Sequence, residues 1–432
     1  MAMISPFRAW RYNPGRVRPA DVLTQPYDKI TPAMQEHYHR ASPWNLVRIE
    51  LGRSQPGDSE AAGVYTRAAA SFREWRQQGV LLEDAEPSLY VYSQRFHVPG
   101  GGPARERSGL IALGRIEDYD AGVVFRHEQT HSGPKADRLN LLRATRAHLG
   151  QLFMLYSDPE RALESRLKDA GELQTDVLDE YGVRHRLWKV SDPEAIEFAR
   201  RSLAEKKLLI ADGHHRYETA IAYRNQRRAE GNSLEPDAPW EWVMMTLVNM
   251  DSEDLVILPT HRVLFGLERF NTEDLLRGAR EWFEVSSASG PLDAPQATSL
   301  LAAAGSEGCA LVAVTASGGF LLRAKPQAVD LALHQLSPRQ RKLDVVLLHK
   351  LLIERVLGVS EEAVRELRNI AYLREAEEAM ARVRQGADVA FLMNPVTIAQ
   401  LREVAFAGEV MPQKSTDFYP KLLSGIAIYA LD

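Results

Sequence analysis

The sequence has a single cysteine, Cys309, and no long apolar run. One thiol cannot form an internal disulfide, so a reducing compartment, the cytoplasm, is the expected location. No apolar run approaches the ~20 residues that a membrane-spanning helix needs. Residues 1–14 carry Arg8, Trp10 and Arg11 but no apolar stretch typical of a secretory signal. We therefore expect a protein that is neither exported by that route nor embedded in a membrane.

The sequence also lacks an excess of charge of either sign. It has 53 Lys and Arg residues against 58 Asp and Glu residues, a net charge of -5, and these residues are scattered along the chain. Such a balance creates no long-range field that would attract nucleic acid or an anionic membrane. No nucleic-acid partner is expected, and any bound anion has to be held by local groups. A homodimer is compatible with the sequence.

The common nucleotide-binding motifs are missing as well. There is no Walker A sequence, no kinase glycine-rich loop with its lysine, and no dinucleotide fingerprint. The glycine-rich stretch 99–103 is predicted to connect two strands, because no helical pattern follows it. The common nucleotide-binding folds are therefore poor fits to this sequence.

Short apolar runs alternate with helical patterns, which predicts an α/β fold of the mixed α+β type. Strands are predicted at 46–49, 89–92 and 110–113, and a helix at 61–78. Helices are also predicted at 159–170 and 193–205, and a strand at 240–249. No internal repeat or low-complexity tract occurs, so solenoids and disordered tails are not expected.

The sequence predicts two domains, 1–265 with the nucleotide- and phosphate-binding catalytic core, and 266–432 as a second mixed α/β domain. A Ser, Gly, Pro and Ala-rich stretch at 286–295 is typical of an exposed connection. Beyond it, the sequence predicts a hairpin at 309–324, an amphipathic helix at 342–357, a strand at 389–393 and a helix beginning near residue 397.

The most informative stretch is 208–220, where an apolar run ends at Asp212-Gly213 and a helical pattern starts at once with His214, His215 and Arg216. A strand, a tight turn and a helix start direct backbone N–H groups and a positive dipole end at one place. Gly213 allows the backbone to turn, and Arg216 adds a forked donor suited to phosphate. The alternative is an ordinary strand-to-helix turn with its polar groups in solvent.

Residues 127–131 contain a His-Glu-x-x-His pattern, with which two histidines one helical turn apart bind zinc. The preceding residues 122–125 are extended in character, and Gly133-Pro134 interrupts a helix. We favour a polar loop that brings His127, Glu128 and Thr130 into a site. Metal-dependent hydrolysis through His127, Glu128, His131, His214, His215 or His261 stays a third alternative.

Other candidate binding residues lie in three places. Lys135 and Arg138 open a predicted helix and can bind phosphate oxygens or form a solvated helix face. Thr260 and His261 follow the apolar run 255–258, at a strand end where sites gather. The predicted loop near 408–425 contains further candidates and is expected to close over a ligand or to be a surface connection. Those candidates are Lys414, Ser415, Thr416 and Tyr419.

Hydroxyl phosphorylation needs carboxylates near the acceptor, cations on the moving phosphoryl group, and usually Mg²⁺. Asp28, in the turn 25–30, is a candidate base or metal ligand, and Glu128 and Asp212 are the predicted Mg²⁺ ligands. The catalytic candidates are Asp28, His127, Glu128 and Asp212.

Taken together, residues 211–220, His127 to Thr130 with Lys135 and 137–139, Pro259-Thr260-His261, and 411–425 resemble a family of bacterial and archaeal proteins, domain of unknown function 1015. The turn at Asp212 to Arg216 is more loosely similar to the phosphate-binding turn of the ParB and sulfiredoxin superfamily, which includes free serine kinases. That resemblance implies a ParB/sulfiredoxin-like nucleotide-binding core. It assigns Gly213, His214, His215 and Arg216 to phosphate and places Asp212 at the catalytic or metal position.

The leading hypothesis is a Mg²⁺-dependent kinase that uses ATP or ADP on a small hydroxyl metabolite, with free L-serine as the first candidate. The alternative is a ParB-like switch that binds nucleotide without turning over a small molecule.

Overall fold

A computed structural model describes residues 2–59, 62–128, 132–168, 170–231, 235, 237–288 and 292–432. The chain forms two compact units. Unit 1 comprises Met1–Arg126, Thr130–Val256 and Phe418–Asp432, and unit 2 comprises His127–Gln129 and Ile257–Asp417. The chain therefore leaves unit 1 and returns to it near its C-terminus.

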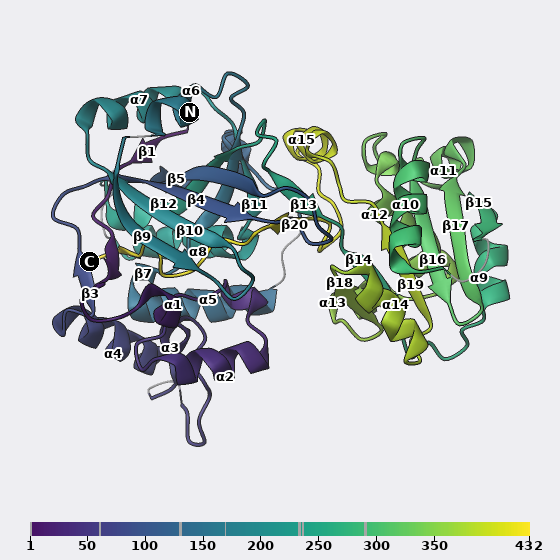
Figure 1. The fold of residues 1–432 in the computed structure, drawn as a ribbon, viewed down its shortest axis with the longest axis horizontal. Coiled ribbons are helices and arrows are strands. Elements are labelled where there is room, and N and C mark those ends of the chain that lie inside the picture. Colours follow the sequence, from purple (N-terminus) through teal and green to yellow (C-terminus); the bar gives the residue numbers. More distant parts are fainter. Residues whose placement is uncertain are drawn as a thin grey trace. The chain divides into compact units, whose positions relative to one another are not determined.

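The centre of unit 1 is a nine-stranded mixed sheet (Figure 1). Its strands follow the order β6 (Val124–Phe125), β11 (Leu208–Asp212), β8 (Leu152–Tyr156), β12 (Trp242–Asn249), β5 (Arg105–Arg115), β4 (Leu89–Phe96), β10 (Arg184–Val190) and β9 (Glu172–Leu178), with β1 (Ile4–Ser5) paired to β5. The pairs β6–β11 and β8–β12 are parallel, and the other pairs are antiparallel. The predicted mixed α/β class is confirmed, whereas the ParB/sulfiredoxin-like core remains a prediction.

Helices pack on both sides of this sheet. They are α1 (Pro19–Val22), α2 (Pro32–Ala41), α3 (Val47–Glu50), α4 (Val64–Gln77), α5 (Ser132–Thr145), α6 (Ala162–Leu167), α7 (Pro193–Ala204) and α8 (His214–Ala229). Figure 1 shows α6 and α7 on one side and α1 to α5 on the other, with the C-terminal segment running along the sheet on that second side. Leu163 of α6 and Ala199 of α7 join Leu110, Met154 and Met245 of the sheet in one buried core.

The predicted strand at 46–49 is wrong, because residues Val47–Glu50 form helix α3. Leu46, Val47 and Ile49 are buried as expected. The Asn45 side chain accepts the Val47 N–H at 2.9 Å, which stabilises a helical start. A short apolar run does not distinguish a strand from a buried helical turn, and here a polar neighbour decides the outcome.

Unit 2 contains a six-stranded antiparallel sheet in the order β15 (Phe283–Ser287), β17 (Gly318–Ala324), β16 (Ala310–Thr315), β19 (Val389–Met393), β14 (His261–Leu264) and β18 (Ile370–Leu373). Its helices include α10 (Ala294–Gly305), α14 (Ala376–Arg384) and α15 (Ile398–Phe406). Leu301 of α10 and Met380 of α14 pack with Val312 and Leu392 in a second buried core. The predicted hairpin at 309–324 and the strand at 389–393 are confirmed.

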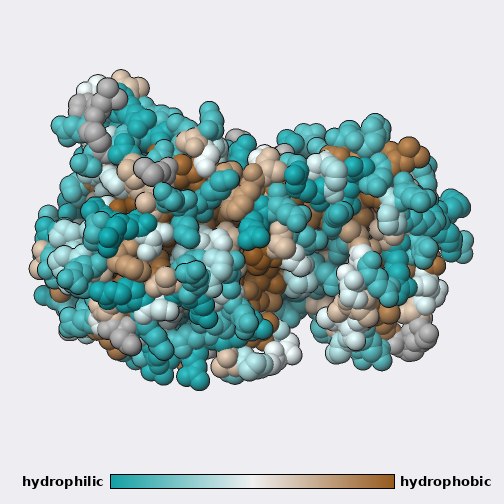
Figure 2. Space-filling view, turned by 90° about the horizontal axis from the view of Figure 1, so that it is seen from above, coloured by the Kyte–Doolittle hydropathy of each residue, from teal (hydrophilic) through white to brown (hydrophobic). Residues whose placement is uncertain are grey.

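No helix among the described residues is long and apolar enough to cross a lipid bilayer. Hydrophilic residues cover most of the face that Figure 2 shows.

Candidate functional site

The turn between β11 and α8 has the geometry that the sequence predicts. Asp212 ends the strand, Gly213 follows with φ 97°, and α8 begins at His214 without a side-chain cap. A methyl group on Gly213 would lie 3.0 Å from Leu152 Cδ2 and 3.1 Å from Arg216 Nε. Both the positive φ and the close approach of the Arg216 side chain therefore require glycine here.

Arg216 is held at two points beside this turn. Its Nη2 donates to Asp212 Oδ2 at 3.0 Å, and its Nη1 donates to the Gln151 carbonyl oxygen at 2.6 Å. Its Nε is buried and has no hydrogen-bond acceptor among the described residues. The guanidinium also lies against Gly150, where an added Cβ would be 3.3 Å from Nη1. The charge is thus fixed in place, with two of its five N–H donors engaged in these bonds.

Asp212 lies among three cations. Lys421 Nζ is 3.2 Å from Asp212 Oδ1, Arg216 holds the other oxygen, and Lys29 is a third neighbouring positive charge. Burial raises the pKa of the Asp212 carboxyl, but these three charges outweigh burial and hold its pKa well below the ordinary value. We call Lys29, Asp212, Arg216 and Lys421 the Asp212 cluster.

A second carboxyl group lies next to this cluster. Glu50, at the end of α3, is 3% exposed, and its Oε2 has no partner within the described parts of the chain. Burial raises its pKa, and the nearby Arg138, Ser424 and Arg216 oppose that rise. A Cβ on Gly150 would lie 2.8 Å from Ser424 Oγ and 3.6 Å from Glu50 Oε1, so these groups converge on one glycine.

Arg138 and Tyr27 complete the surroundings of Glu50. The Arg138 guanidinium lies 4.2 Å from the centre of the Tyr27 ring and donates to the Glu50 carbonyl oxygen at 2.9 Å. Asp28, next to Tyr27, is close enough to raise the pKa of both Tyr27 and Glu50. Burial is the largest cause of the Tyr27 shift, to about 12. We call Tyr27, Asp28, Glu50, Arg138 and Ser424 the Glu50 cluster.

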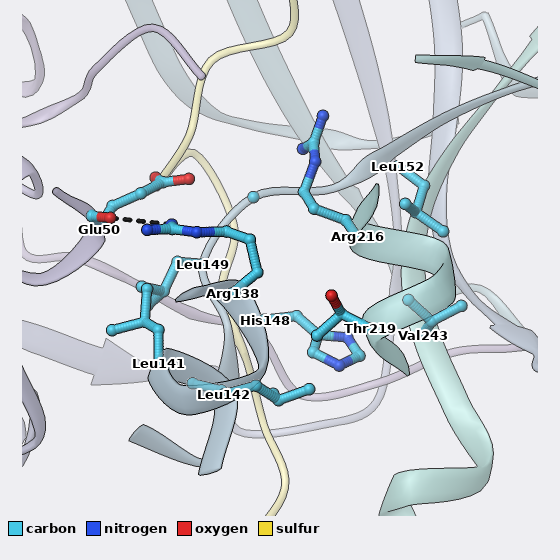
Figure 3. Close-up of a pocket in the computed structure, with 12 residues that line it drawn as sticks. Glu50, Arg138, Leu141, Leu142, His148, Leu149, Leu152, Arg216, Thr219 and Val243 are labelled. Carbon is cyan, nitrogen blue, oxygen red and sulfur yellow. Dashed lines mark hydrogen bonds between the residues drawn. The ribbon is translucent and has the colours of Figure 1, made fainter. Parts of the chain in front are cut away.

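A small cavity of about 60 Å³ opens beside both clusters. Figure 3 shows Arg138 reaching towards Glu50, and Arg216 coming from α8. The rest of the lining is mainly apolar and consists of Leu141, Leu142, Ala147, His148, Leu149, Gly150, Leu152, Thr219 and Val243. His148 is buried there with a pKa lowered by burial to about 4, and its Nδ1 accepts the Met244 N–H.

In unit 2, residues 127–128 pair with the segment before β20 (Asp417–Tyr419). The His127 Nε2 atom lies 2.8 Å from Thr416 Oγ1, and the Ser415 N–H donates to Glu128 Oε1 at 3.1 Å. The Met411 N–H donates to the His127 carbonyl oxygen. We call these residues the His127 cluster. His127 and Glu128 are not helical, which removes the geometry that a His-Glu-x-x-His zinc helix requires.

His261 lies beyond the end of β13 (Val256–Leu258), as predicted, and is itself the first residue of β14. It is 4% exposed and accepts the Met393 N–H on Nδ1. Burial lowers its pKa to about 4. Thr260 lies just before β14, and its carbonyl oxygen accepts from the fully buried Arg262. These contacts account for the burial of His261 and Arg262 within the sheet.

The structure distributes the predicted site residues over both units. Unit 1 holds Asp28, Lys135, Arg138, Asp212, Gly213, His214, His215, Arg216 and Tyr419, and unit 2 holds His127, Glu128, Thr260, His261, Lys414, Ser415 and Thr416. Thr130 and His131 lie outside the described residues. Lys135 forms an ion pair with Glu218 of α8. The roles of these residues stay predictions.

Sequence reasoning did not identify Lys29, Glu50, Gln151, Lys421 and Ser424. Lys29 and Lys421 lie within the two stretches that the sequence singled out, 25–30 and 411–425, so their charge was a usable signal. The sequence around Glu50 and Gln151 contains no such signal, because the burial of these two residues depends on tertiary contacts.

Both Asp212 oxygens are engaged by cations, and the roles of Asp212 and Glu128 as Mg²⁺ ligands stay predictions. Among the described residues, no group of three His, Cys, Asp or Glu side chains could hold a metal ion.

Comparisons with known proteins give a family and distant structural neighbours. No curated protein matches the chain. A free serine kinase mutant in complex with ADP matches at 14% identity and a TM-score of 0.36, covering 72% of this chain and 87% of that chain. A conserved hypothetical protein from Pyrococcus furiosus matches at 12% identity and a TM-score of 0.34, covering 72% and 90%. SbnI with a C-terminal truncation, from Staphylococcus aureus, matches at 10% identity and a TM-score of 0.35, covering 73% and 85%.

The sequence identities and TM-scores of these structural neighbours are too low to support an argument about activity. The sequence match is different in kind, because it spans residues 4–346, which include both clusters of unit 1 apart from Lys421 and Ser424. The chain belongs to the family described as Protein of unknown function (DUF1015).

Proposed function

We propose that the protein is a kinase that transfers a phosphoryl group from ATP or ADP, with Mg²⁺, to a hydroxyl group of a small metabolite, with free L-serine as the first candidate. The observation that carries the proposal is the Asp212 cluster. Three positive charges surround one carboxylate at a helix start, so this cluster taken by itself has an excess of two positive charges. Such an excess favours a ligand with several negative charges, and a phosphate chain has them.

The arrangement of donors supports binding through phosphate oxygens. Arg216 keeps its unpartnered Nε while its two other nitrogens are fixed, so little side-chain entropy remains to be lost on binding. Positive groups held in place before the reaction stabilise charge that develops on the transferred phosphoryl group. Arg216, Lys421 and Lys29 are assigned to that role.

The Glu50 cluster supplies the acceptor side of the proposal. The hydroxyl oxygen of the acceptor attacks phosphorus, the bond from phosphorus to the nucleotide oxygen breaks, and the hydroxyl proton passes to a carboxylate. Asp28 and Glu50 are the carboxylates at hand, and the raised pKa of Glu50 makes it a better proton acceptor than an ordinary glutamate. No described residue is assigned to Mg²⁺, and the proposal does not depend on the His127 cluster.

Calorimetry with ADP and ATP, with and without Mg²⁺, tests the binding step. Arg216→Ala should weaken nucleotide binding at least tenfold, whereas Arg18→Ala should leave it unchanged, because the Arg18 side chain is 83% exposed and forms an ion pair with Asp21. Equal affinity of the wild type and Arg216→Ala for every nucleotide would exclude the site.

Phosphorus NMR of nucleotide mixed with L-serine and other small hydroxyl compounds tests turnover. Glu50→Gln should lower the turnover rate at least a hundredfold with little change in nucleotide affinity, because a positioned base contributes about 10²–10⁴-fold. Nucleotide binding without transfer to any acceptor would contradict the kinase and favour the switch.

A further inference from the structure

Lys421 lies on a segment whose backbone is held by side chains of the unit 1 sheet. Arg107 Nη1 donates to the Tyr419 carbonyl oxygen at 3.1 Å, and Arg107 Nη2 donates to the Pro420 carbonyl oxygen at 2.6 Å. Gln94 Nε2 donates to the Lys421 carbonyl oxygen at 2.7 Å. Three successive carbonyl groups are thus bound by two side chains that face each other across β4 and β5.

The burial of Arg107, which binds this segment, is unusual for an arginine. It is 1% exposed, and no described carboxylate forms an ion pair with it. Burial lowers its pKa to about 9, and its guanidinium lies 4.6 Å from the centre of the Phe153 ring. An apolar residue would avoid the cost of burying an unpaired charge, so stability alone does not explain an arginine here.

A second part of the same network reaches the segment that carries Lys29. The Leu423 N–H donates to the Tyr92 hydroxyl at 3.3 Å, and that hydroxyl is 2.6 Å from His185 Nδ1. His185 Nε2 is 3.1 Å from Asp179 Oδ2, which also accepts from Gln25 Nε2 at 3.0 Å. Gln25 is four residues before Lys29. One tautomer of His185, with its proton on Nε2, fits both contacts. In that tautomer Nδ1 accepts from the Tyr92 hydroxyl, and Nε2 donates to Asp179.

We infer that Gln94, Arg107 and His185 are positioning residues that set where Lys421 and Lys29 lie around Asp212; this inference rests on the proposed function of the Asp212 cluster. The network joins the chain segments of both lysines to one rigid sheet. Because a phosphate chain is bound at several points at once, a displaced lysine loses its contact although its charge remains. The three residues then act on affinity without touching the ligand.

The first test needs no ligand. Lysines of the full chain are dimethylated with ¹³C-formaldehyde, and the Lys421 resonance is identified from its loss in Lys421→Arg. Arg107→Met and Gln94→Leu should each move this resonance to the position of solvent-exposed lysines, because Nζ leaves Asp212. Arg105→Met is the matched control on the same strand, since Arg105 is only half-buried and its side chain donates to the Glu253 carbonyl oxygen. A Lys421 resonance unchanged in both variants would overturn the inference.

The second test measures inorganic pyrophosphate binding by calorimetry. Arg107→Met, Gln94→Leu and His185→Leu should weaken binding at least tenfold, while Arg107→Lys and His185→Gln should recover part of it. Thermal unfolding identifies any variant that does not fold, and His185→Gln, which keeps hydrogen-bonding groups, provides a milder variant. Unchanged affinity in all folded variants overturns the inference. A wild-type protein that binds no pyrophosphate contradicts the proposed function instead, and the lysine resonances still decide the positioning role.

Discussion

Arg216 illustrates how neighbouring residues determine the position of a charged side chain. Its guanidinium fits between Gly150 and Gly213, each of which would bring a Cβ to within 3.3 Å of it. Asp212 and the Gln151 carbonyl group then fix its direction. A search for cations by sequence can find Arg216, but the space it occupies depends on two glycines more than sixty residues apart in the sequence.

Gly213→Ala should therefore destabilise the protein by more than the backbone effect alone. Gly213 and Gly182 both have positive φ, 97° and 74°, but a methyl group on Gly182 meets nothing within 4 Å. The Gly182→Ala variant should lose about 1 kcal/mol, the cost of the left-handed conformation. Gly213→Ala should lose about 1–2 kcal/mol more, because Leu152 or Arg216 has to move. Urea unfolding measures both losses, and equal losses would contradict the close approach.

Asp344 of unit 2 gives a prediction about pH. Its carboxyl accepts the Ala310 N–H at 3.1 Å, and burial raises its pKa from 3.8 to about 6. Because the pKa of Asp344 is higher in the folded protein than in the unfolded protein, the protonated carboxyl stabilises the fold at a pH below its unfolded-state pKa. That stabilisation is lost as the pH rises through the folded-state pKa.

Asp344→Asn cannot lose a proton, so its stability relative to the wild type should increase between about pH 4 and pH 8. The increase should reach at most about 3 kcal/mol, from roughly two pKa units. Denaturant unfolding across this range measures it. Asp330→Asn, at a side chain that is 61% exposed, should show no such trend. If the difference in unfolding free energy between Asp344→Asn and the wild type did not change with pH, the carboxyl of Asp344 would not be desolvated.

At the scale of elements, the sequence predicts most strands and helices but not all of their detail. The turn from β11 into α8 is predictable because Gly213 and the change of periodicity lie next to each other. The helix predicted at 342–357 exists in part as a π-helix, Leu348–Val356. Hydrophobic periodicity does not distinguish π from α hydrogen bonding, because both leave apolar residues on one side. The position of His261 within β14 depends on tertiary packing in the same way.

The start of α10 provides a prediction at this scale. Asp293 accepts the Gln296 N–H at 2.8 Å, and the Gln296 side chain accepts the Asp293 N–H, which forms a capping box. Asp293→Ala should cost about 1 kcal/mol, and Asp293→Asn should cost less because it keeps an acceptor. Urea unfolding of both variants tests this. An equal loss in both would show that the charge, rather than the cap, stabilises α10.

At the scale of the molecule, each unit has its own buried core. No motif in the sequence indicates that residues 418–432 belong with the first unit. Only long-range contacts, such as those of Arg107 with the Tyr419 and Pro420 carbonyl groups, decide their place.

Leu301→Ala, in the core of unit 2, should affect the two units differently. Leu301 is 2% exposed, so the change should destabilise unit 2 by about 2–5 kcal/mol. Trp282 is the one tryptophan in residues 257–417, and fluorine labelling makes its unfolding visible by NMR. The Trp282 transition should move to lower urea, while pyrophosphate affinity under native conditions stays unchanged. A parallel loss of affinity would show that the unit 1 site depends on the unit 2 core.

The return of the chain to unit 1 has a consequence for biosynthesis. Lys29 leaves the ribosome early, whereas Lys421 and Ser424 follow only after the whole of unit 2 has been translated. A nascent chain can therefore form most of the first sheet while the Asp212 cluster still lacks one of its cations. Translation that stops before residue 421 would yield a polypeptide that contains Asp212 and Arg216 but lacks the lysine that pairs with Asp212 Oδ1.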